Sequence, residues 1–142
     1  MEVSQVRNRL KRAIDAARER GQQRRQRTAE AEGEYAAFLE EVAIPVTRQV
    51  ANALKVEGYN FTVFTPGGGL RLASDRTRDD YIEFSLDGDG STPQVVARIS
   101  QTRGSRTQDE ERPVKAGVSP AALTDEDVLT FLLDALQPWL ER

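Results

Sequence analysis

The chain has 142 residues, contains neither cysteine nor histidine, and carries a formal net charge of -3. The missing cysteines exclude disulfides, thiolate metal sites and a cysteine nucleophile, and the missing histidines remove the commonest general base, the commonest zinc ligand and every serine–histidine triad. The length fits one domain. Because the chain shows no run of about 18 apolar residues and begins without an apolar leader, we expect a cytoplasmic protein that does not enter a membrane.

Charge and apolar residues are distributed unevenly along the chain. Residues 1–27 hold nine Lys or Arg against three acidic residues, a net charge of +6, whereas residues 28–142 carry -9. Only four Leu, Ile, Val or Phe residues lie within residues 1–33. The sequence therefore predicts two parts, a basic helical arm over residues 1–33 and an α+β domain that contains the hydrophobic core over residues 34–142.

The arm begins with an apolar stripe. Its apolar residues recur at spacings of three and four, which places them along one face of an α-helix. Arginines occupy the later positions of that face, so only the first half of the helix can dock through it. We predict one long helix from about residue 2 to residue 31, with a break near Gly33. The stripe residues are candidates for self-association or for docking of the arm: Val3, Val6, Leu10 and Ile14.

A second helix is predicted over residues 34–57, where a broad apolar face follows the helical period. Pro45 lies inside this segment, and proline removes a backbone donor and clashes with the carbonyl four residues before it. We therefore expect either a kink or two helices, over residues 34–43 and 45–57. Gly58 then ends the helix.

From residue 59 the apolar period changes from 3.6 to 2, which indicates strands. Four such runs predict an antiparallel meander packed on one face: residues 59–64, 70–73, 81–86 and 94–100. The core-facing residues are predicted to be Tyr59, Phe61, Val63, Leu70, Leu72, Ile82, Phe84, Leu86, Val95, Ala97 and Ile99. Residues 101–113 contain no apolar side chain, so we expect a surface excursion there, and residues 114–118 are the candidate for a fifth strand at the sheet edge.

The helical period returns after residue 123. Thr124 is the expected N-cap, three acidic residues follow it in the first turn, and Pro138 should perturb the last turn. The residues predicted to face the core are Val128, Leu129, Leu132, Leu133, Leu136 and Leu140. The fold class is therefore α+β, with a long N-terminal helix, a kinked second helix, a meander of four or five strands and a C-terminal helix on the core side.

Two surfaces are candidates for partner binding. One is the arginine-rich half of the arm, and the other is the outward face of the meander, where alternation places aromatic and apolar side chains between arginines. That open face can stack unpaired bases, receive a partner helix or be covered by the chain's own arm. The candidate residues are Arg18, Arg20, Arg24, Arg25 and Arg27 on the arm, and Phe64, Arg71, Tyr81, Val96 and Arg98 on the sheet.

Three further segments can suggest ligand sites. The Gly-rich run at 66–69 precedes a strand pattern, whereas a phosphate loop precedes a helix, so we interpret it as a hairpin turn. The run "DGDGST" at 87–92 begins like a calcium loop, but Thr92 stands where that loop needs glycine, and a turn explains it better. The carboxylates of Asp79, Asp80, Glu83 and Asp87 form the densest acidic group near a strand, and such a group can bind magnesium for hydrolysis.

These features favour a non-enzymatic protein-interaction module, an adaptor or regulatory subunit, without a cofactor or a metal. Its partner would be another protein or a second copy of the chain, because the acidic body would repel a nucleic-acid duplex. The first alternative is nucleic-acid binding through residues 7–27 with help from Arg103 and Arg106. The second alternative is a metal-dependent hydrolase that uses Asp80, Glu83 and Asp87.

Overall fold

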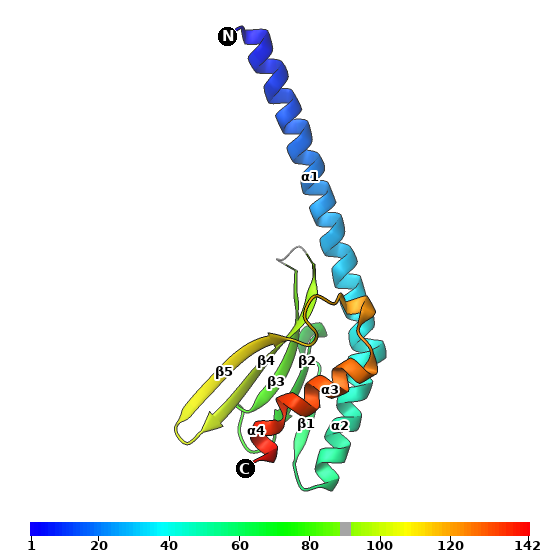
Figure 1. The fold of residues 1–142 in the computed structure, drawn as a ribbon, viewed down its shortest axis with the longest axis vertical. Helices are drawn as coiled ribbons and strands as arrows, with labels where there is room; N and C mark the ends of the chain where they lie inside the picture. The colour runs from blue at the N-terminus through cyan, green and yellow to red at the C-terminus, as the bar shows by residue number, and fades with distance from the viewer. Residues whose placement is uncertain (89–91) are drawn as a thin grey trace.

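The computed structural model describes residues 1–88 and 92–142 and has the predicted α+β architecture (Figure 1). A helical rod is formed by α1 (Val3–Phe38), a π-helical turn η1 (Leu39–Ala43) and α2 (Ile44–Val56). A five-stranded sheet and the C-terminal helices follow. Part of the predicted turn at 87–92 lies outside the described residues. Within residues 1–88 and 92–142, every helix is too short or too polar to cross a membrane.

The predicted break near Gly33 is wrong, because α1 runs without interruption to Phe38. A single glycine costs a helix only about 1 kcal/mol relative to alanine. The residues after Gly33 begin to pack on the body, with Phe38 and Leu39 buried, and this packing outweighs the cost.

Pro45 divides the helical rod in the way that the sequence predicts. It lies in the first turn of α2, immediately after η1. A proline at the start of a helix needs no donor, and the wider π-helical turn before it accommodates the missing backbone hydrogen bond. The chain turns from helix to sheet at Gly58, whose φ is 91°, a value that favours glycine.

The sheet is an antiparallel meander with the strand order β1-β2-β3-β4-β5. Its strands are β1 (Phe61–Phe64), β2 (Leu70–Ser74), β3 (Tyr81–Asp87), β4 (Gln94–Arg103) and β5 (Arg106–Pro113). The short 3-10 turn η2 (Pro66–Gly68) joins β1 to β2, as expected of a hairpin turn. The first four strands confirm the predicted meander.

The fifth strand is not where the sequence pattern indicates. Residues 106–113 form β5, so the predicted surface excursion is wrong, and residues 114–118 lie outside the sheet. Gly104, with a φ of 63°, makes the tight turn that returns the chain along β4. Most side chains of β5 are exposed and polar. The strand is held by backbone hydrogen bonds to β4. Because these bonds do not depend on the side chains, the sequence of β5 needs no alternation of apolar and polar residues.

The core lies between one face of the sheet and the helices α2 and α3, where α3 spans Asp125–Ala135. The sheet contributes Leu70, Leu72, Ile82, Phe84, Val95, Ala97 and Ile99, all buried as predicted. Val96 was predicted to point outward and is nevertheless buried. It lies beside Pro113 of β5. The sequence analysis placed residue 113 in a surface excursion, so it did not predict this neighbour.

The C-terminal helix begins at the predicted cap. The Thr124 hydroxyl accepts a hydrogen bond from the Asp127 amide at 3.2 Å, and the Asp127 carboxylate accepts one from the Thr124 amide at 3.0 Å. The hydrogen bond from the Thr124 amide holds the pKa of Asp127 below its ordinary value. Lys115, whose Nζ lies 3.3 Å from the Asp127 carboxylate, lowers this pKa further. The helix is interrupted at Leu136, and Pro138 lies in the first turn of α4 (Gln137–Leu140). The short turn η3 (Pro120–Ala122) precedes this region and lies beside α1 (Figure 1).

Candidate functional site

The first 28 residues of α1 form an arm that projects away from the body (Figure 1). At a rise of 1.5 Å per residue, this segment is about 42 Å long. Residues 3–30 are exposed except for Gly21, and Ala31 is the first residue of the helix whose side chain is buried. The arm begins with a capping box in which Glu2 and Gln5 satisfy each other's backbone amides. The arm is therefore a helix with a capped N-terminus whose side chains stay exposed instead of packing on the body of the same chain.

The apolar stripe of the arm is open to solvent. The side chains of Val3 and Leu10 are 75% and 58% exposed, and those of Val6 and Ile14 are also exposed. The arm thus does not cover the outward sheet face of its own chain, which was one of the three occupants considered for that face. An exposed aliphatic stripe of this kind on a helix is typical of a surface that binds something else.

The arginines of the arm are exposed and unpaired. In the part of the chain that the structure describes, none of the ion pairs includes Arg18, Arg20, Arg24, Arg25 or Arg27. Further along the same rod lies an acidic segment whose carboxylates are also exposed: Glu30, Glu32, Glu34, Glu40 and Glu41. A basic segment and an acidic segment therefore follow each other along one helical rod.

The outward sheet face is largely satisfied by its own side chains. Arg71 donates a hydrogen bond to Glu83 at 2.9 Å, and its guanidinium lies 4.0 Å from the centre of the Tyr81 ring. Arg98 pairs with Asp109 of β5 at 2.8 Å. Phe64 is half exposed. Since Arg71 covers Tyr81 and Val96 is buried, this face offers less free surface than the sequence predicted.

The acidic group near β3 does not gather around one point. Asp80 is buried, accepts a hydrogen bond from the Thr102 amide at 2.6 Å and pairs with Arg142 at 3.3 Å. Glu83 pairs with Arg71, as described above, and Asp87 lies at the end of β3. Among the described residues, no group of three potential ligands could hold a metal ion. Asp80 therefore ties the start of β3 to β4 and to the C-terminus.

The two basic segments of the nucleic-acid hypothesis lie apart. Arg103 and Arg106 face each other across the turn between β4 and β5. Figure 1 shows that this hairpin tip and the arm extend toward opposite ends of the molecule. The fold does not bring them together.

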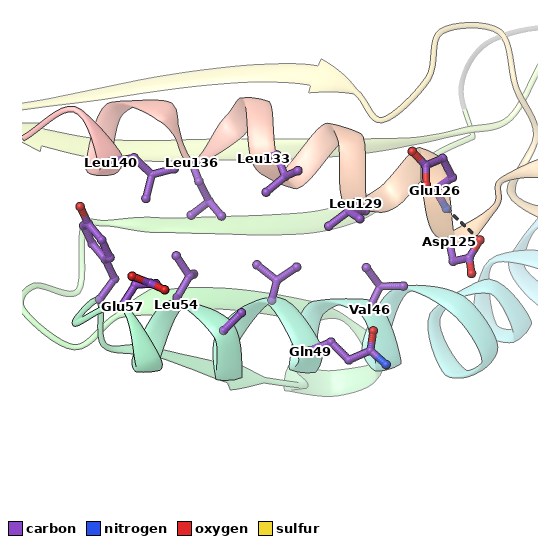
Figure 2. Close-up of a pocket in the computed structure, with 13 residues that line it drawn as sticks. Val46, Gln49, Leu54, Glu57, Asp125, Glu126, Leu129, Leu133, Leu136 and Leu140 are labelled. Carbon is purple, nitrogen blue, oxygen red and sulfur yellow. Dashed lines mark hydrogen bonds between the residues drawn. The ribbon is translucent and has the colours of Figure 1, made fainter.

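An apolar groove between α2 and the C-terminal helices was missed by the sequence analysis. It has a volume of about 540 Å³. Figure 2 shows leucine side chains of α3 and α4 directed toward the aliphatic side chains of α2 across the gap. The lining residues are Val46, Gln49, Val50, Ala53, Leu54, Glu57, Tyr59, Asp125, Glu126, Leu129, Leu133, Leu136 and Leu140.

The groove explains an error in the predicted core. Leu133 was expected to face the core, but it is 49% exposed and lines the groove, whereas Phe131 is buried against Phe84 with ring centres 6.0 Å apart. The sequence did contain a signal of the groove, because α3 carries apolar residues on a wider part of its surface than one core-facing side requires. Acidic side chains stand at both ends of the groove, Glu57 at one and Asp125 with Glu126 at the other (Figure 2).

No protein-family model, curated protein or solved structure matches this chain.

Proposed function

We propose that the protein is a non-enzymatic interaction module, an adaptor or regulatory subunit, that binds another protein chain through its N-terminal arm. The observation that carries this proposal is the solvent-exposed aliphatic stripe on a helix that its own body leaves unsupported. Full burial of one aliphatic side chain of this size is worth roughly 1.5 to 3 kcal/mol. Four such side chains on one stripe can therefore supply the energy of a specific contact.

The arginines of the arm support a protein partner that carries acidic side chains. Unpaired guanidinium groups gain affinity and orientation from carboxylates on a partner surface. They can equally bind phosphates. However, phosphate binding gives no role to the aliphatic stripe, and the second basic segment at Arg103 and Arg106 lies at the far end of the molecule. A protein partner gives a role to both halves of the arm.

The test is site-specific photo-crosslinking of the full chain in the cells from which it comes. A photoreactive residue replaces Leu10 in one variant and Val56 in a matched control, because Val56 is 84% exposed but lies on the body at the end of α2. We expect a covalent protein adduct from position 10 that is much stronger than the adduct from position 56.

Two results would contradict the proposal. Equal adducts from both positions would mean that the arm is only an exposed surface. An adduct from position 10 that nuclease treatment removes would favour the nucleic-acid alternative.

A further inference from the structure

We propose that the occupant of the groove is the arm of a second copy of this chain, so that two copies form a symmetric antiparallel dimer in which each arm docks on the other body. This inference rests on the proposed function, since it names the partner of the same arm. It assigns a binding site, the groove between α2 and α3, to the stripe formed by Val3, Val6, Leu10 and Ile14.

The stripe and the groove match in length and chemistry. The stripe runs from Val3 to Ile14, and the α2 wall of the groove runs from Val46 to Glu57. Each spans eleven residues of helix rise, about 17 Å. The stripe is aliphatic, and so is most of the groove wall. An amphipathic helix laid in an apolar groove is a recurring mode of recognition between protein chains.

The arm cannot occupy the groove of its own chain. It continues through α1 and η1 directly into α2, which forms one wall of that groove. Figure 1 shows the arm extending away from the body along the line of this rod. A helix cannot fold back on its own continuation without breaking, so the stripe can reach a groove only in another molecule.

The direction of docking follows from charge. In an antiparallel arrangement, Val3 lies level with Glu57 of the second copy and Ile14 lies level with its Val46. The same register places Arg20 level with Glu40 and Arg27 between Glu32 and Glu34. The basic segment of each copy therefore lies along the exposed acidic segment of the other, whereas a parallel docking of the same stripe would place Arg20 and Arg27 level with residues 63 and 70, beyond the end of α2.

The acidic end of the groove formed by the start of α3 agrees with this register. Asp125 and Glu126 stand at the end of the groove near Val46 (Figure 2). That end receives Ile14, around which the arm carries three basic residues, Lys11, Arg12 and Arg18, and one acidic residue, Asp15. A two-fold axis near Glu30 makes both contacts identical, as in most homodimers.

The first measurement is the mass of the purified full chain by sedimentation over a dilution series from nanomolar to high micromolar concentration. We expect a monomer–dimer equilibrium. Leu10→Glu in the arm and Leu133→Glu in the groove should each raise the dissociation constant by roughly a hundredfold, because each change disturbs two symmetric contacts. Val56→Glu, an exposed aliphatic position outside the groove, is the matched control and should leave the mass unchanged.

The second measurement tests where the arm lies. Because the chain has no cysteine, Leu10→Cys and Gln49→Cys can be made separately and the two proteins mixed under oxidising conditions. The predicted register gives a disulfide between the two variants, and much less between two copies of either variant alone. A dominant disulfide between two copies of Leu10→Cys would instead indicate arms paired with each other, and it would overturn the groove assignment.

The third measurement tests the direction. Arg20→Glu or Glu40→Arg alone should weaken the dimer several-fold, more at low salt than at high salt. The double variant should recover the affinity, because the two reversed charges face each other again. Failure of the double variant to recover would overturn the antiparallel register.

These experiments separate this inference from the proposed function. A chain that stays monomeric at every concentration would overturn the second copy as partner. If position 10 still forms its protein adduct in cells, the interaction module stands with a different partner. If neither a dimer nor an adduct is observed, both proposals fail.

Discussion

The arm and the body of this protein place their apolar side chains in opposite environments. In the body, residues such as Leu72, Ile82 and Leu132 are almost completely buried between the sheet and the helices. In the arm, the aliphatic stripe faces solvent on a helix of comparable regularity. Helical periodicity is the same signal in both regions, and it says which residues share a face without saying what covers that face.

The comparison also separates two kinds of ionic contact. In the body, Asp80 is buried and fully engaged by a backbone amide and by Arg142. On the arm, the charged groups are exposed, and none of them forms an ion pair within the described residues. Charges of the first kind serve the stability of the fold, whereas those of the second kind are available to a partner.

The largest effect is expected from aliphatic truncation in the two regions. Leu132→Ala in the body should lower the free energy of unfolding by about 2 to 5 kcal/mol, because it leaves a cavity in a closed core. Leu10→Ala in the arm should change it by less than about 0.5 kcal/mol at a dilution where the chain is monomeric. Urea titration followed by the fluorescence of Trp139, the only tryptophan, measures both. Similar losses for the two variants would mean that the arm is part of the folded core.

The next effect concerns Asp80. Asp80→Ala should cost about 2 kcal/mol, because it leaves the buried Thr102 amide without its acceptor and Arg142 without its partner. The matched control is Asp109→Ala, which removes an exposed partner of Arg98 and should cost much less than Asp80→Ala, because solvent screens that pair. The same urea titration with and without magnesium measures both losses. A magnesium-dependent stability of the parent chain that disappears in Asp80→Ala would speak for the hydrolase alternative.

A smaller effect tests the continuity of arm and body at Gly33. Gly33→Ala should raise the stability of the helix by about 1 kcal/mol, because a Cβ there meets no atom within 4 Å and the backbone is helical. Gly58→Ala should instead destabilise the protein, since Gly58 has a positive φ. Thermal unfolding followed by circular dichroism compares the two variants. A loss of stability in Gly33→Ala would contradict an uninterrupted helix through this position.

The smallest effect concerns Tyr35, where the arm meets the body. Its hydroxyl is buried without a hydrogen-bond partner, and its ring stacks on Phe38 with centres 6.3 Å apart. Tyr35→Phe should therefore leave the stability at neutral pH unchanged or raise it by up to about 1 kcal/mol. Chemical denaturation of the two proteins at neutral pH tests this.

The same residue predicts a dependence on alkaline pH. Burial, with a further contribution from Glu83, raises the pKa of Tyr35 to about 12. Below the ordinary tyrosine pKa of about 10, the phenol is protonated in both folded and unfolded chains. Between pH 10 and 12 the unfolded chain loses this proton first, so the stability falls as the pH rises. Tyr35→Phe should lose less stability over this range than Tyr59→Phe, which keeps Tyr35, and equal losses would contradict the assignment.

The sequence by itself determined the elements that depend on local pattern. The helical period of the arm, the alternation in the first four strands and the cap at Thr124 each follow from contacts between near neighbours in the chain. The fold class and most of the core followed from them. The sequence also placed the four aliphatic residues of the arm on one helical face, but it left open whether the chain's own sheet covers that face.

Tertiary structure alone decided the rest. The polar strand β5 is held by backbone hydrogen bonds to β4, which any side chains permit, so its sequence carried no alternation. Phe131 rather than Leu133 fills the core because Phe84 of the distant strand β3 lies opposite it. The groove is formed by two helices far apart in the chain, and a space between such segments depends on how they pack rather than on the pattern within either one.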